Sequence, residues 1–426
     1  MRYQPVVLVV VAACLLARPV GAGDSAPLQL ADLLDEAERA SPQLAAMRAR
    51  VEAAEIGASA REALPDPTLS TVYTNDGLTS FTLGSSEFTN LTVSWEQEVP
   101  GRSVRGSSAA VAHAQANALQ AGSATASARL RARVITLFAE LWRLDRTRVL
   151  LVESRALLTT AAEAAGARYE SGEGIQEGLI RARIAVRRLD VEIEELALER
   201  RTAELALGEA LGRANDPEFG PAGELPDLAE PIDVEGLTAA GAASSPEVRE
   251  YVSRERAAEV ALDDARVQVK STYSWMAAYQ FRGGLDPMVM GGFSVKLPVW
   301  KDRKQERAIA AAEIERTAAV REREETELRA SAGTRGRAAE TASLDLRLRL
   351  YREAIVPQSM AAFESANAAF GSGRAEMFLV LDDLDRWTGA RRDELTLSAR
   401  RVEAIASLEA MTGTTLFAIP GSGRSQ

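Results

Sequence analysis

The chain has 426 residues, of which 46% are hydrophobic, 26% charged and only 5% aromatic. Alanine, leucine, glutamate and arginine recur throughout, and this composition favours long helices. The formal net charge is −11 at pH 7, with charges of both signs interspersed. This argues against a nucleic-acid-binding protein, which would normally carry a basic face or stripe.

The N-terminus has the pattern of a secretory signal peptide. Arg2 precedes an apolar run over residues 6–17, and small residues end at Ala22, which predicts a signal peptide over 1–22. The apolar run is shorter than the ~20 residues that a spanning helix requires, and no later run is longer. Any membrane crossing by this exported chain must therefore use β-strands.

Cys14 is the only cysteine, so the mature chain forms no disulfide. Residues 11–14 also resemble a lipobox, in which the chain is cleaved before the cysteine and a lipid is attached to it. The apolar run continues through Leu15 and Leu16, which favours the signal peptide instead. Lipidation of Cys14 stays open as the alternative.

Two halves of the chain share one layout. Ser41-Pro42 opens a helical stretch towards Glu62, and Ser245-Pro246 opens a similar stretch towards Val269. Residues 169–172 and 370–373 form another matching pair at nearly the same offset, as do residues 207–212 and 408–413. We predict a first repeat over 23–213, a proline-rich linker over 214–231, a second repeat over 232–414 and a flexible tail over 415–426.

Each repeat has the pattern of a helix, two strands, a very long helix, a glycine turn and a returning helix. No proline lies between Pro100 and Pro217, and the helical pattern over 103–169 corresponds to roughly 100 Å. The equivalent stretch, 302–370, is interrupted only at Pro357, where we expect a kink or a packing adjustment. No compact domain requires helices of this length.

The strands alternate strictly between apolar and polar residues. The apolar face of the second, third and fourth strands comprises Leu91, Val93, Trp95, Tyr273, Trp275, Tyr279, Phe281, Phe293 and Val295. The first strand, 68–75, has a weaker pattern, and turns are expected at 76–77 and 282–284. This alternation predicts a transmembrane barrel with lipid outside and water inside, so these nine residues are expected to face lipid. A soluble sheet lying on a core would show the same alternation and is the alternative.

Four strands cannot close a barrel. Each open edge within hydrocarbon would leave backbone groups without hydrogen bonds, at a cost of several kcal/mol each. Self-assembly of several copies is therefore a physical requirement of the membrane hypothesis.

Several segments resemble the TolC family of outer-membrane factors, and more narrowly its CusC and CzcC heavy-metal branch. They are LPDPTL at 64–69, EVPGR at 98–102, ARYESG at 167–172, FSVKLPVW at 293–300 and, less closely, FGSG at 370–373. The resemblance covers nearly the whole mature chain and implies a mainly α fold with a small β part. In that fold three copies share a twelve-stranded outer-membrane β-barrel and a long α-helical barrel that crosses the periplasm, with an internal two-fold repeat.

The same resemblance implies a homotrimer in the outer membrane of a Gram-negative bacterium, in contact with lipid, a periplasmic adaptor and an inner-membrane pump of the RND class. The adaptor would dock at the helix tips, through Tyr169, Gly172, Glu173, Gly174, Phe370, Gly373, Arg374 and Ala375. The family's gate often carries acidic rings; Asp382 fits one position, whereas Leu379 occupies the other. Asp383 and Glu177 are further candidate gate residues. A solvated helix face is the alternative for all three acids.

The sequence offers no constellation for catalysis. His113 is the sole histidine, and without a second histidine or a mature cysteine neither a zinc or copper site nor a histidine-assisted nucleophile can be assembled. No phosphate-binding loop is present. We therefore expect no enzyme, no cofactor and no metal site.

The leading hypothesis is a passive, gated exit duct of a tripartite efflux system, exporting heavy-metal cations or drugs. One alternative is the outlet of a type I protein secretion system. An alternative of another class is a soluble periplasmic coiled-coil scaffold, for which the helices alone would suffice. The sequence does not identify the exported substrate.

Overall fold

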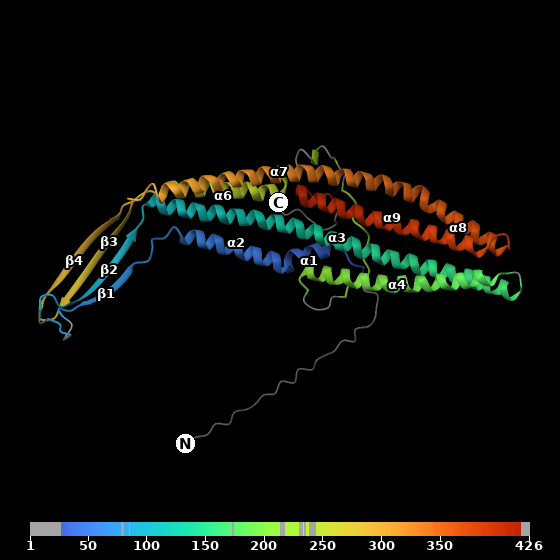
Figure 1. The fold of residues 1–426 in the computed structure, drawn as a ribbon, viewed down its shortest axis with the longest axis horizontal. Helices are drawn as coiled ribbons and strands as arrows, with labels where there is room; N and C mark the ends of the chain where they lie inside the picture. Colours follow the sequence, from blue (N-terminus) through green and yellow to red (C-terminus); the bar gives the residue numbers. More distant parts are fainter. Residues whose placement is uncertain are drawn as a thin grey trace, which may run out of the picture.

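The computed structural model describes residues 27–77, 81–84, 86–172, 174–213, 218–229, 233, 236–237 and 244–418. In this part of the chain a four-stranded sheet lies at one end of an elongated molecule, and long helices run from it to the opposite end (Figure 1). The predicted signal peptide and Cys14 lie outside the described residues. Among the described helices, none is both long and apolar enough to span a bilayer.

The first half begins with a short helix that the sequence did not lead us to expect. Its elements are α1 (Leu30–Ala40), α2 (Pro42–Ala60), β1 (Thr68–Thr74), β2 (Asn90–Val99), α3 (Arg102–Glu170) and α4 (Gln176–Leu211). α1 forms because Leu30, Leu33, Leu34 and Ala37 recur at helical spacing, and all four are buried. Ser41 separates α1 from α2 and accepts a hydrogen bond from the Leu44 amide at 3.5 Å.

The second half repeats the order of the elements from α2 to α4. Its elements are α6 (Pro246–Val267), β3 (Thr272–Arg282), β4 (Leu285–Lys296), α7 (Gln305–Leu350), a π-helical turn η1 (Tyr351–Ile355), α8 (Val356–Gly371) and α9 (Met377–Thr412). The adjustment expected near Pro357 is confirmed, because a π-helical turn ends at Ile355, two residues before this proline. Proline lacks the amide hydrogen that a regular α-helical ladder needs, and the extra residue of the π turn accommodates it.

In each half, the glycine that ends the last helix lies against the proline at the start of α2 or of α6. Gly212 and Gly413 end α4 and α9 with left-handed φ angles of 73° and 69°. A Cβ on Gly212 would lie 2.8 Å from Cδ of Pro42, and a Cβ on Gly413 would lie 3.1 Å from Cδ of Pro246. A side chain at either position would be strained by the positive φ and would approach the proline ring too closely, so both positions require glycine.

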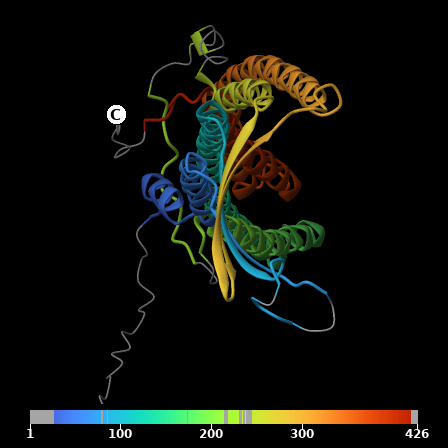
Figure 2. The ribbon, with the colours of Figure 1, turned by 90° about the vertical axis from the view of Figure 1, so that its left-hand side faces the viewer.

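The core lies along the middle of α3, which contacts α2, α4, α6 and α9. Seen from the sheet end, the helices form a curved layer behind the strands (Figure 2). Fully buried side chains of α3 include Ile135, Phe138 and Leu141, and they pack with Leu207 of α4 and Ile405 of α9. Burial of these apolar side chains holds the two halves together.

The linker and the segment after α9 both contribute to this core. Phe417 is only 2% exposed, and Leu228 of the linker forms an antiparallel bridge with it. Oε1 of Glu409 accepts hydrogen bonds from the amides of Leu416 and Phe417 at 2.6 and 2.9 Å. Within the predicted tail 415–426, residues up to 418 therefore pack against the core, and residues 419–426 lie outside the described residues.

Candidate functional site

The strand register places all nine expected lipid-facing residues on one face of the sheet. The sheet is an antiparallel meander in the order β1-β2-β3-β4. Leu91 of β2 is paired with Phe281, and Val93 with Tyr279. On the other side of β3, Trp275 is paired with Phe293 and Tyr273 with Val295. Paired residues of neighbouring strands point to the same face, so the alternation in three separate strands combines into one apolar surface.

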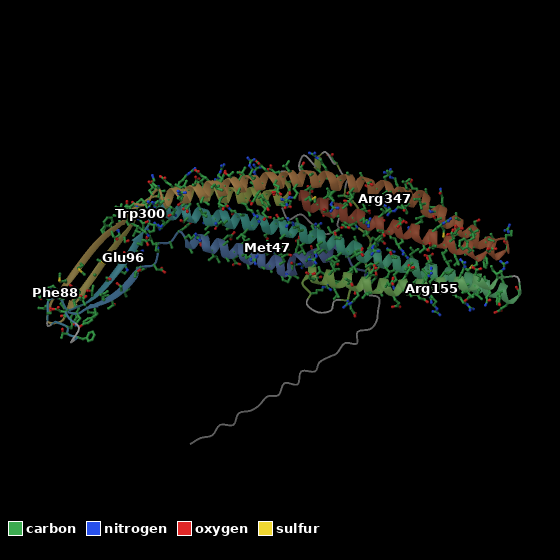
Figure 3. All side chains as sticks on the ribbon, viewed as in Figure 1. Met47, Phe88, Glu96, Arg155, Trp300 and Arg347 are labelled. Carbon is green, nitrogen blue, oxygen red and sulfur yellow. The ribbon has the colours of Figure 1, made fainter. Side chains whose placement is uncertain are left out.

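Eight of these nine side chains are exposed, and Leu91 is half-buried. Trp275 is 55% exposed, and its ring lies 4.8 Å from that of Phe293. Strand β1 adds Leu69, paired with Trp95, and Tyr73, paired with Leu91. The sheet stands clear of the helices except at its base (Figures 1 and 3), so these aromatic side chains lie outside the chain's own core.

The opposite face of the sheet is mainly polar. Ser70 and Ser94 are paired across β1 and β2, with 2.6 Å between their hydroxyl oxygens. Ser274 and Ser294 are paired across β3 and β4. Glu96, also on this face, is labelled in Figure 3. Strands β1 and β4 are the sheet's two edges, each with a neighbouring strand on one side only.

The α3–α4 hairpin and the α8–α9 hairpin both end at the end of the molecule opposite the sheet (Figure 1). Gly172 and Gly373 take left-handed φ angles of 81° and 73° where α3 turns into α4 and α8 into α9. A hollow of about 520 Å³ lies between the tips and is lined by Arg168, Gly174, Glu177 and Gly373 among others. The expected glycine turns are therefore present and adjoin a shared hollow.

The residues expected at the adaptor-docking tips differ in exposure. Tyr169, Gly172, Gly373 and Arg374 are exposed, and Gly174 and Ala375 are half-buried. Phe370, by contrast, is buried in the apolar cluster between the hairpins, so its side chain serves the tip's own packing. Glu173 lies outside the described residues.

Sequence reasoning did not single out Arg168 as a tip residue. Its Nη1 donates a hydrogen bond to the carbonyl oxygen of Phe370 at 2.7 Å, which links the α3–α4 hairpin to the α8–α9 hairpin. The two residues are 202 positions apart, so no local pattern could have paired them.

The three candidate gate acids are each paired with an arginine on their own helix. Asp382 lies 2.8 Å from Arg386, and Asp383 lies 3.7 Å from the same guanidinium. Glu177 lies 2.6 Å from Arg181. The charge of these carboxylates is thus partly offset within the chain, and Asp383 is buried.

Solved structures of outer-membrane channels superpose on nearly the whole chain. CusC, which forms a transmembrane channel, gives a TM-score of 0.78 at 15% identity, covering 91% of this chain and 93% of CusC. VceC of Vibrio cholerae gives 0.74 at 18% identity, with 90% and 96% covered. The open state of the Neisseria gonorrhoeae channel MtrE gives 0.75 at 17% identity, with 90% and 89% covered. The chain has the TolC-like fold.

The expected fold class is therefore confirmed. At such low identities the likeness concerns the TolC-like fold itself. No protein-family model matches the sequence, and no curated protein matches it either.

Within the described part of this TolC-like fold, no cluster of three or more histidine, cysteine, aspartate or glutamate side chains could hold a metal ion. His113 is half exposed, and its Nε2 lies 3.7 Å from Glu62. Many of the described charges form ion pairs on helix surfaces, such as Arg321 with Glu324 at 2.6 Å. The solved structures named above are channels rather than enzymes.

Proposed function

We propose that this chain is a subunit of a TolC-family outer-membrane channel and forms the exit duct of a tripartite efflux system. One observation carries the proposal: a sheet with an uncovered, aromatic-rich face and a polar face projects from a bundle of very long helices. Strands β2, β3 and β4 have 10, 11 and 12 residues, close to the ~9–11 that cross a bilayer when tilted. Nine apolar side chains would face lipid, and the serine-rich face would line water.

The proposed channel is a homotrimer. The free edges of β1 and β4 would pair between copies, because a membrane-embedded sheet must satisfy every backbone group by closing on itself. Three copies of four strands make a twelve-stranded barrel, which lies within the range of known outer-membrane barrels. The solved channels that share the fold support this assembly.

The helical end is proposed to dock a periplasmic adaptor that connects the duct to an inner-membrane RND pump. The exposed tip residues Tyr169, Gly172, Gly373 and Arg374 are the proposed contacts, and Glu173 remains a candidate. Because the sequence carries no phosphate-binding loop, we expect the pump to supply the energy. The proposed cargo, a heavy-metal cation or a drug, would be chosen by the pump.

Cell fractionation and a planar-bilayer recording test this proposal together. We expect the full-length protein in outer-membrane detergent extracts as an oligomer, and we expect stepwise conductance from the purified oligomer. A soluble monomer from the periplasm would contradict the proposal and favour the coiled-coil scaffold. Co-purification with a secretion ATPase instead of an RND pump would assign the duct to type I secretion.

A further inference from the structure

A short segment joins the sheet to the helical body at the end of β4. Residues 297–304, here called the junction segment, connect β4 to α7 through a series of turns. Leu297, Val299 and Trp300 are 62%, 73% and 64% exposed, although large apolar side chains normally avoid water. Trp300 lies where the sheet meets the helices (Figure 3).

Lysine is confined to this region of the molecule. The chain has four lysines, Lys270, Lys296, Lys301 and Lys304, whereas its arginines are spread over the whole sequence. Nζ of Lys270 is hydrogen-bonded to Ser103 at 3.1 Å. Lys301 and Lys304 are exposed, and Arg303 lies over the Trp300 ring at 6.0 Å. With Asp302 as its one carboxylate, the junction segment is locally basic in a chain of net charge −11.

The other half of the duplicated chain shows that this segment is not needed to connect a strand to a helix. There, α3 begins at Arg102, two positions after Pro100. In the second half, α7 begins at Gln305, seven positions after Pro298. The additional length holds Trp300 and the basic cluster, so it needs an explanation beyond chain connection.

Apolar and aromatic side chains followed directly by cations match the boundary between hydrocarbon and headgroups. Tryptophan is enriched at membrane interfaces, and basic side chains there attract anionic lipid phosphates. The junction segment continues the apolar face of the sheet, since Leu297 follows Val295 on the same side of the alternation. It lies at the end of the sheet nearest the helices.

We propose that the junction segment binds the headgroups of anionic phospholipids in the leaflet nearest the helical body. Leu297, Val299 and Trp300 enter the interface of the bilayer. Lys301, Arg303 and Lys304 contact the lipid phosphates. This proposal rests on the proposed function, because it requires the sheet to span a membrane.

Lipid binding to the full-length oligomer in detergent tests the proposal. Phosphatidylglycerol and phosphatidylcholine are added separately, and bound lipids are counted by native mass spectrometry. The test variant is K301Q/R303Q/K304Q. The matched control is R321Q/R335Q/R347Q, which removes the same charge from exposed positions of α7 away from the sheet. We expect the wild type and the control to prefer phosphatidylglycerol, and the test variant to lose this preference on the order of tenfold.

Equal binding of the two lipids to a conducting wild-type oligomer would overturn the lipid proposal and leave the channel function intact. An unchanged preference in the test variant would also overturn it. Loss of the oligomer in the test variant alone would assign the junction segment to contacts between copies of the chain, again against the proposal. A wild type without oligomer or conductance would refute the channel function and the lipid proposal with it.

Discussion

The guanidinium of Arg168 lies 5.2 Å from the centre of the Phe370 ring while it donates to the carbonyl oxygen of the same residue. One side chain of α3 thereby holds the end of α8 through two interactions. This contact joins the two hairpin tips beside the apolar cluster that contains Phe370 and Met377.

Replacing Arg168 with alanine should loosen the two tips. The lost charge-assisted hydrogen bond and cation–π contact contribute about 1 to 3 kcal/mol in a half-buried setting. Hydrogen exchange of the amides over 165–178 and 368–378 should accelerate on the order of tenfold. Arg148→Ala, at an exposed position of the same helix, should leave both segments unchanged; equal acceleration in the two variants would refute the role of Arg168.

Arginine on the apolar face of the sheet should block membrane insertion. Trp275→Arg and Tyr279→Arg each place a charge against the proposed lipid, at ~2 to 4 kcal/mol near the membrane midplane. Ser274→Arg and Gln280→Arg introduce the same charge on the opposite face, where water is expected. Recovery of oligomer from outer-membrane extracts should fail for the first pair and persist for the second. Normal insertion of the first pair would exclude lipid contact at this face.

The glycines that close each half should not tolerate a side chain. Gly212→Ala and Gly413→Ala combine a left-handed φ with a close approach to proline, and each should lower the free energy of unfolding by roughly 1 to 3 kcal/mol. Gly336→Ala is the matched control in α7, where a Cβ would meet nothing within 4 Å. That change should stabilise the helix by roughly 0.5 to 1 kcal/mol. Denaturant unfolding measures all three, and similar effects for all would contradict this account.

The pair of Glu36 and Arg213 should make stability depend on acidic pH. Two hydrogen bonds of 2.8 Å from Arg213 lower the pKa of Glu36 below its ordinary value. The stabilisation is present above the ordinary carboxyl pKa and is lost as pH falls through the lower pKa of the folded state. Because both side chains are about a third exposed, it should amount to under about 1 kcal/mol.

Melting temperatures from neutral to acidic pH test this pair. Glu36→Gln should melt below the wild type at neutral pH, and the difference should shrink as the medium becomes acidic. Glu38→Gln, on an exposed carboxylate of the same helix, should show no such convergence. If the difference in melting temperature between Glu36→Gln and the wild type stayed constant across this pH range, the charge of the Glu36 carboxylate would be ruled out as its cause.

Arg386 should control how strongly the acidic tip attracts cations. It partly offsets the negative charges of Asp382 and Asp383 on the same helix, so Arg386→Ala should strengthen block of the conductance by divalent or trivalent cations. Adding Asp382→Asn to that variant should remove the gain. Arg400→Ala, exposed near the far end of α9, should behave as the wild type. Unaltered block in Arg386→Ala would remove this cluster from the gate.

Much of the fold could be predicted from local patterns. The long helix expected over 103–169 is found at Arg102–Glu170, because alanine-rich, proline-free sequence has one favourable local conformation. The second long helix begins at Gln305 rather than at residue 302, since the junction segment forms turns first. α1 was not predicted, because a helix of 11 residues is marginal by itself and depends on the burial of its apolar face.

The candidate sites could be predicted only in part. The alternation of apolar residues identified the lipid-facing set strand by strand, since one side-chain period determines one face. Arg386 and Arg181, the partners of Asp382 and Glu177, lie one helical turn away, so these ion pairs could be predicted from the sequence. The burial of Phe370 beneath Arg168 could not be predicted from the sequence, because the two hairpins meet only after folding.

Local sequence is enough to specify the elements of this protein: the helices that begin after Ser41 and Ser245, the glycine turns between helices, and the apolar side of each strand. These features depend on neighbours within a few residues, whose preferences act in any context. The common register of the strands, the link that Arg168 makes between two hairpins and the burial of Phe417 follow only from the folded arrangement. Such contacts join residues far apart in the chain, and only the simultaneous packing of all helices selects them.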